Sequence, residues 1–136
     1  MTEPLWIDAR DALTLHDRLL ALHGGASGVR DHTLLNSALA RPQQLYAYAD
    51  APGLLDLAAA YTAGVVRNHP FIDGNKRTGF VVGILFLELN GARFTAPEAE
   101  AAQAVLALAA GTLDETGYRN FLRAHSHLPN SPSPRL

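Results

Sequence analysis

The amino-acid sequence predicts an all-α protein, a compact bundle of about six helices in one domain. Apolar residues recur three and four positions apart through most of the chain, which is the spacing of one helix face. Short stretches rich in Gly, Pro and Asn separate these patterned segments. The length of 136 residues suits one domain with a single core. We expect the domain to cover residues 1–128 and the Pro- and Ser-rich residues 129–136 to form a disordered tail.

The first expected helix covers residues 8–22, where leucines form an apolar stripe and Asp8 is placed as the N-cap. It ends before residues 23–28, whose three glycines predict a flexible loop or a short hairpin flap. Asp31 would cap a second helix. We expect that helix to stop before Pro42, because the residue that precedes a proline is disfavoured in the α region. Residues 43–51 would then be a connection.

The second half of the chain begins with two strongly apolar helical patterns. One starts near Pro52 and continues to Val66, and the other covers residues 75–89 and is apolar on nearly every face. A helix apolar all round lies at the centre of its fold, so we expect residues 75–89 there. Gly91 would follow it in a left-handed conformation. Two shorter helices complete the prediction: residues 97–110, and one that starts at Thr112 or Asp114.

The composition excludes several classes of function. A formal net charge of −2 argues against a surface that neutralises many phosphates, so we expect no direct nucleic-acid partner. The chain has no cysteine, which excludes disulfide bonds. Its longest apolar stretch, residues 80–87, is far shorter than the ~20 residues that span a bilayer. No signal-peptide pattern follows Met1. We therefore expect a cytoplasmic protein without a membrane partner.

The segment from Asn68 to Gly79 joins the two apolar helices and holds the residue types of a phosphate-handling site. His69 is expected at the end of a helix, where it either caps unpaired carbonyl groups or acts as a general base. Asp73 either caps the following helix or binds Mg²⁺, a cation that takes carboxylate and phosphate oxygens. Phe71 is most simply a core residue.

The residues that follow Asp73 indicate a bound anion. Gly74 permits close approach of the backbone, and free N–H groups at a helix start bind phosphate. Asn75 belongs to that start, although capping alone would also explain it. Lys76 and Arg77 place two cations in the first turn, where they oppose the helix dipole unless an anion lies there. This local misfit predicts a phosphate site.

The nine residues from His69 to Arg77 resemble the signature of the Fic/Doc superfamily, His-x-Phe-x-Asp/Glu-Gly-Asn-x-Arg. With Lys76 in the variable place, the segment is similar to the Doc (death-on-curing) branch. The resemblance extends from Trp6 to His125, nearly the whole chain. The other parts similar to Doc-type sequences are residues 24–31, 39–42, 58–61 and 87–91.

This resemblance implies an all-helical Fic fold, with a catalytic loop between two core helices. It also implies transfer of part of a nucleotide to a protein hydroxyl group. His69 would be the base, and Asp73 would be the Mg²⁺ ligand. The residues that bind the phosphates of ATP would be Gly74, Asn75, Lys76, Arg77 and, outside the signature, Arg67.

The lysine at position 76 bears on which group is transferred. Most Fic enzymes carry glycine there and transfer AMP, whereas in the Doc branch the nucleotide is thought to bind reversed and to present its γ-phosphate. Doc-type toxins phosphorylate a threonine of elongation factor Tu and thereby stop translation. The resemblance therefore favours a toxin kinase that uses ATP and Mg²⁺. The alternatives are a protein adenylyltransferase and a non-enzymatic co-regulator.

The resemblance also implies a protein partner. Fic enzymes often carry an inhibitory helix with the pattern Ser or Thr, three residues, Glu, and then Gly or Asn, and this sequence has no match to it. We therefore expect inhibition by a separate antitoxin, which places a helix in a groove beside His69. Residues 24–28 are either a flap that orients the target peptide by strand addition or a plain connection.

Overall fold

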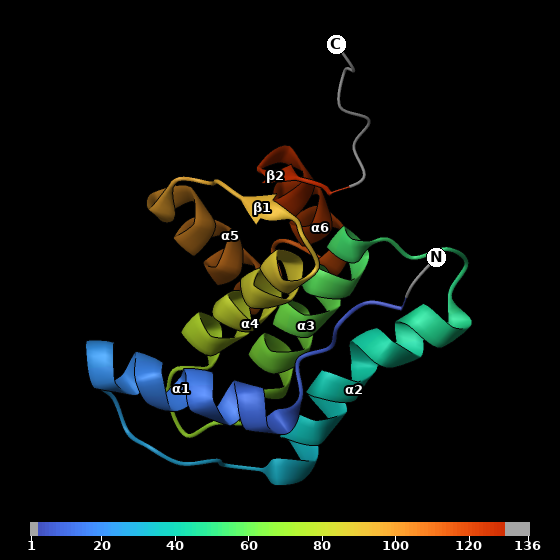
Figure 1. Cartoon of the computed structure of the whole chain (residues 1–136). Coiled ribbons are helices and arrows are strands. Elements are labelled where there is room, and N and C mark those ends of the chain that lie inside the picture. Colours follow the sequence, from blue (N-terminus) through green and yellow to red (C-terminus); the bar gives the residue numbers. More distant parts are fainter. Residues whose placement is uncertain (1–2, 130–136) are drawn as a thin grey trace.

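The computed structural model describes residues 3–129 and shows a helical bundle with one small sheet (Figure 1). The helices that these residues form confirm the predicted fold class. The tail expected at residues 129–136 lies outside the described residues, apart from Pro129. The helices are α1 (Ala9–His23), α2 (His32–Tyr48), α3 (Leu54–Asn68), α4 (Asn75–Leu89), α5 (Glu98–Ala110) and α6 (Glu115–Ala124).

Most helix boundaries lie at the capping residues that the sequence indicates. Asp8 and Asp31 are the N-caps of α1 and α2, and each accepts a backbone N–H group of the first turn. Asp114, and not Thr112, caps α6 in the same way. Gly91, with a φ of 87°, follows the end of α4 in the left-handed region. Side-chain chemistry at these positions therefore sets where the helices begin and end.

Helix α2 does not stop at Pro42, as the sequence predicted, but continues through it to Tyr48. The proline lacks the N–H group that would bond to the carbonyl group of Ala38, and this costs the helix about 3 kcal/mol. Burial compensates for the loss. The Pro42 ring is buried, and beyond it Leu45 and Tyr46 pack against the hydrophobic core. Residues 43–48 are therefore helix and not connection.

The centre of the fold is α3 and not α4. The expectation that residues 75–89 lie at the centre was therefore wrong. Every residue from Leu57 to Val66 is buried, whereas α4 leaves Phe80, Ile84 and Leu85 partly exposed. Helix α3 contacts α2, α4, α5 and α6 (Figure 1). Its small residues allow neighbouring helices to approach from every side. These small residues are Ala58, Ala59, Ala60, Ala63 and Gly64.

Close packing of α3 against α4 fixes the two helix ends that flank the candidate site. A Cβ atom at Gly79 would lie 3.2 Å from the carbonyl oxygen of Thr62, and one at Gly83 would lie 3.0 Å from that of Ala58. The hydroxyl group of Thr62 also donates a hydrogen bond of 2.8 Å to the carbonyl oxygen of Gly79. The loop between α3 and α4 is therefore held between two helices that cannot easily shift.

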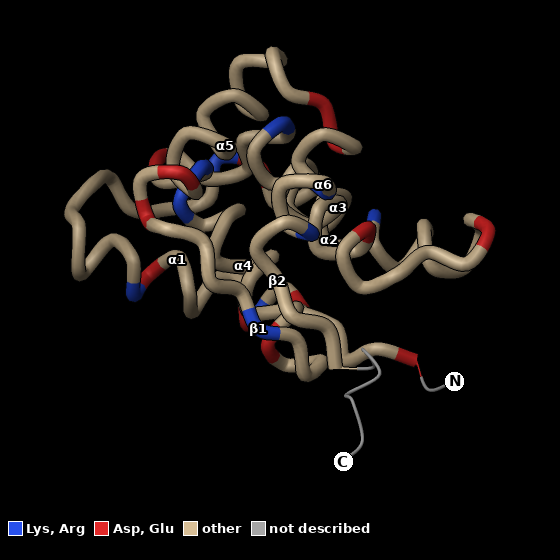
Figure 2. Tube along the Cα trace, turned by 90° about the horizontal axis from the view of Figure 1, so that it is seen from above, with Lys and Arg blue, Asp and Glu red and all other residues tan. Residues whose placement is uncertain are grey.

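Two short strands were not predicted. Strand β1 (Arg93–Phe94) pairs antiparallel with β2 (Ser126–His127), so the sheet joins the α4–α5 connection to the end of α6 and is not formed by residues 23–28. Within residues 3–129, no helix combines the length and apolar character needed to cross a membrane. Acidic and basic residues are interspersed along the described chain, without a continuous basic stripe (Figure 2).

Candidate active site

His69 ends α3 in a conformation that few residues other than glycine adopt. Its φ of 52° and ψ of 54° lie in the left-handed region, and its backbone N–H group donates to the carbonyl oxygen of Val65. A left-handed residue that is not glycine costs on the order of 1 kcal/mol. The residue as a whole is exposed. His69 therefore occupies the C-cap position of α3 and is exposed to solvent.

The side chain of Asn75 holds the loop closed from inside. Its Oδ1 atom accepts the N–H group of Phe71 at 2.9 Å, and its Nδ2 atom donates to the carbonyl oxygen of Phe71 at 2.9 Å. Both residues are buried, and Phe71 is a core residue as predicted. The amide group of Asn75 is thus engaged by the loop itself. These two hydrogen bonds explain an Asn in this place by structure alone.

Asp73 presents an ionised carboxylate at the start of α4. Its Oδ2 atom accepts the N–H group of Ala26 at 3.1 Å, and its Oδ1 atom accepts that of Gly74 at 2.8 Å. These two hydrogen bonds, aided by the positive charge of Arg77, hold the pKa of the Asp73 carboxyl below its usual value. The residue is exposed. A hard anionic oxygen is therefore available beside the loop at neutral pH.

This carboxylate suits a Mg²⁺ ion that takes most of its ligands from elsewhere. In the described part of the chain, no three His, Cys, Asp or Glu side chains are grouped so as to hold a metal ion. Mg²⁺ commonly binds to one or two carboxylates and completes its octahedron with substrate phosphates and water. Asp73 fits that pattern, and its carboxylate would hold the metal.

The first turn of α4 is the place where the sequence predicts a bound anion. Gly74 is its N-cap, with a φ of 78°, and the first intrahelical bond runs from the N–H group of Thr78 to the carbonyl oxygen of Gly74. By position, the N–H groups of residues 75–77 have no acceptor within the helix. Lys76 and Arg77 are both exposed on this turn. Donors and cations are thus brought together, as the sequence predicted.

Arg67 points elsewhere. Its Nη1 atom lies 3.5 Å from Oε1 of Glu115 on α6, and the same oxygen lies 2.7 Å from Nη1 of Arg41. The structure therefore does not add Arg67 to the loop cluster, although both it and the loop adjoin the end of α3. Its contact with phosphate stays a prediction.

Two residues that sequence reasoning missed support the loop from α1 and from the connection after it. Nε2 of His16 lies 2.8 Å from the carbonyl oxygen of Asp73, and its ring stacks on Phe71 at 3.9 Å. Because a carbonyl oxygen only accepts, Nε2 carries the proton. Arg30 donates to the carbonyl oxygens of His69 and Asn68. The sequence held one signal for the role of His16, because this polar residue interrupts the apolar face of α1.

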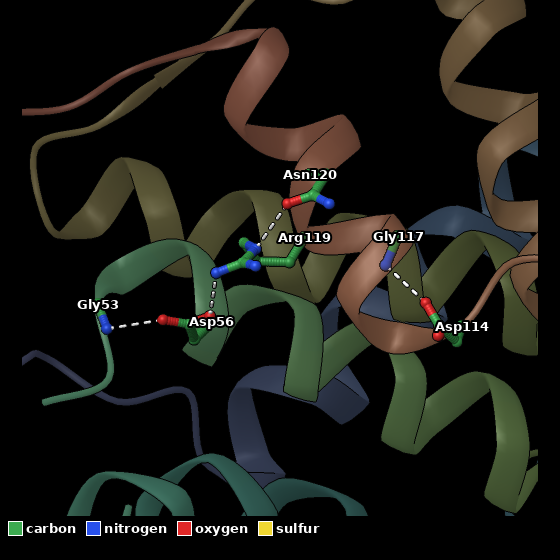
Figure 3. A network of polar contacts seen from close by, with 6 residues as sticks. All are labelled: Gly53, Asp56, Asp114, Gly117, Arg119 and Asn120. Atoms are coloured by element: carbon green, nitrogen blue, oxygen red, sulfur yellow. Dashed lines mark hydrogen bonds and ion pairs between the residues drawn. The ribbon is translucent and has the colours of Figure 1, made fainter. Parts of the chain in front are cut away.

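A cavity of about 280 Å³ lies between the end of α2, the start of α3 and the start of α6, apart from this loop. Two of its acidic side chains are already paired. Asp56 accepts hydrogen bonds from Arg119 at 3.0 Å and from the N–H group of Gly53 at 2.9 Å (Figure 3), and Glu115 pairs with Arg41. These pairs explain the charges of Asp56 and Glu115 by structure, and we place the candidate site at the α3–α4 loop.

Known proteins of one family are similar to this chain. A family model described as "Fic/DOC family" matches residues 6–87, a range that includes the whole loop. The chain is 42% identical to "Toxin Doc" of Mycolicibacterium smegmatis over 97 residues, which are 71% of each chain. It is 33% identical to "Protein kinase doc" of Escherichia phage P1 over 93 residues, which are 68% of this chain and 74% of the phage protein.

Proposed function

This chain belongs to the Fic/DOC family, and on that premise we propose that it is a toxin kinase of a toxin–antitoxin pair. It would transfer the γ-phosphate of ATP to a threonine of a translation factor, elongation factor Tu, and arrest translation in the cytoplasm. The relatives named as a Doc toxin and as a protein kinase support this proposal. The observation that carries it is the α3–α4 loop, where an exposed imidazole, an ionised carboxylate and a cationic helix start lie together.

Each part of the loop would have one task. The imidazole of His69 would take the proton of the threonine hydroxyl as its oxygen bonds to the γ-phosphorus and ADP leaves. The first-turn N–H groups of α4, with Lys76 and Arg77, would bind and neutralise the phosphates. Asp73 would hold Mg²⁺, which when bound neutralises charge on the transferred phosphoryl group.

Adenylylation is the second candidate reaction. It uses the same base and the same anion-binding turn, but the α-phosphorus is attacked and AMP is transferred. The lysine at position 76 supports the kinase, because adenylylating members of the superfamily usually carry glycine there. Incubation of elongation factor Tu with ATP labelled at the α- or the γ-phosphate separates the two reactions. Label from the γ-position alone supports the kinase, and label from the α-position rejects it.

Regulation by an antitoxin is part of the proposal. The partner would place an amphipathic helix near His69 and cover apolar side chains that α4 leaves partly exposed. These are Phe80, Val81, Ile84 and Leu85. A non-enzymatic role through this partner is the remaining alternative. Growth arrest that persists in His69→Ala would favour binding over catalysis, whereas arrest that disappears with a folded variant supports the kinase.

A further inference from the structure

The glycine-rich connection between α1 and α2 runs antiparallel to the α3–α4 loop and is bonded to it. The N–H group of Ile72 donates to the carbonyl oxygen of Gly28 at 3.1 Å, and those of Arg30 and Asp31 donate to the carbonyl oxygen of Pro70 at 2.7 and 3.0 Å. Val29 faces Phe71 in a single β-bridge. This connection is therefore attached to the loop. Its backbone fixes the position of Arg30 beside the end of α3.

The guanidinium group of Arg30 binds two carbonyl groups, that of the last residue of α3 and that of its C-cap. Its Nε atom donates to the carbonyl oxygen of His69 at 2.7 Å, and its Nη2 atom donates to that of Asn68 at 2.9 Å. These carbonyl groups lie at the negative end of the helix dipole, where no further helical N–H group is available. The planar guanidinium group presents two parallel N–H donors, a geometry that lysine lacks.

We infer that Arg30 is a positioning residue for His69, an inference that rests on the proposed role of His69 as the base. The left-handed backbone of His69 is unfavourable by itself and persists only where its surroundings hold it. Arg30 bonds directly to the carbonyl group of that residue. The contact fixes the peptide plane after His69, and with it the direction in which the Cα–Cβ bond presents the imidazole. Arg30 therefore aligns the base without contacting the phosphate.

A direct phosphate contact is the competing role for an exposed arginine near the loop. The two roles differ in what they require of the side chain. A phosphate contact depends mainly on positive charge, which lysine retains. A clamp on two carbonyl groups depends on the fork of the guanidinium group, which lysine loses. The Arg30→Lys variant therefore separates the two roles, and Arg30→Ala gives the full loss.

The test measures kcat and KM for Mg²⁺-ATP in wild type, Arg30→Lys and Arg30→Ala, with Arg123→Ala as a matched control. Arg123 is an exposed arginine of α6, so its loss removes the same charge away from the loop. We expect both Arg30 variants to lose about 10- to 100-fold in kcat, because small misplacements of a reacting group have effects of that size. We expect the KM for ATP to stay within about twofold of the wild-type value, since Arg30 does not take part in binding ATP in the ground state. The control should match wild type.

A second measurement does not need catalysis. The ¹⁵N resonances of the His69 ring should shift in both Arg30 variants and not in Arg123→Ala, while all three proteins melt cooperatively. Wild-type kcat in Arg30→Lys, or a raised KM with unchanged kcat, overturns the inference in favour of a charge contact. Unchanged His69 resonances overturn it as well. If wild type transfers neither phosphate nor AMP, the proposed function fails, and the resonances alone decide whether Arg30 positions His69.

Discussion

The two hydrogen bonds of the Asn75 side chain make a strong prediction about the loop. Replacing Asn75 with Ala leaves the N–H and carbonyl groups of Phe71 without a partner, and Phe71 is fully buried. An unsatisfied buried polar group costs ~1–3 kcal/mol, so two of them should lower the free energy of unfolding by about 2–4 kcal/mol after local relaxation. For a domain of this size the melting temperature should fall by roughly 6–12 °C.

The Asn75→Asp variant tests the same contacts one at a time. The carboxylate still accepts from the N–H group of Phe71 but no longer donates to its carbonyl oxygen, so roughly half of the loss is expected. Urea denaturation and thermal melting of both variants measure the effect. Asn120→Ala is the matched control, because Asn120 is exposed on α6 and its side chain hydrogen-bonds to Arg119 alone among the described residues (Figure 3). It should change the free energy of unfolding by less than about 0.5 kcal/mol.

One result would refute this reasoning. If Asn75→Ala unfolds with the free energy of wild type but no longer binds ATP, its side chain acts on the nucleotide and not on the loop. The hydrogen bonds to Phe71 would then be incidental. A stability loss of the expected size, with ATP binding reduced only as far as the loop opens, agrees with the structural role.

Three further outcomes follow from the same structure. His16→Leu should lower the transfer rate about 10-fold by freeing the carbonyl group of Asp73, and His16→Gln, which retains an N–H donor, should recover most of it; equal rates in both variants would contradict the hydrogen-bonding role. Gly83→Ala should lower the free energy of unfolding by roughly 1–3 kcal/mol in urea titration, because the new methyl group meets Thr62 and the backbone of Ala58. The pKa of Asp73 is lowered in the folded state, so its carboxylate contributes stability that is fully present above the usual pKa of 3.8. The advantage of wild type over Asp73→Asn should therefore decline below pH 3.8 and vanish as the pH falls through the lowered pKa of the folded state. An advantage that persists in acid would show that hydrogen bonding by the carboxylate is not its source.

The sequence predicted the helices and the loop because their signals are local. Capping residues such as Asp8, Asp31 and Asp114 act within one turn, and the segment from His69 to Arg77 holds its chemistry in nine consecutive positions. Apolar spacing then identified the helices on either side. The same signals indicated the candidate site, because they placed the nine-residue segment in a loop between two apolar helices that hold it in place.

The errors came from contacts between distant parts of the chain. The continuation of α2 through Pro42 depends on burial of the proline ring, which no local rule contains. The central place of α3 follows from small residues that allow close packing, whereas the apolar residues on nearly every face of α4 had favoured α4. His16 and Arg30 meet the loop across 57 and 39 positions of sequence. Periodicity and motifs alone could not pair them with it.

The claim that the α3–α4 loop transfers a phosphoryl group from ATP with His69 as the base has one direct test. Elongation factor Tu is incubated with Mg²⁺-ATP and either wild type or His69→Ala, and its mass is then measured. We expect a phosphate adduct on a threonine with wild type, formed ~10²–10⁴-fold more slowly by a folded His69→Ala variant. Formation of the adduct at the wild-type rate by His69→Ala, or an AMP adduct in its place, would contradict it.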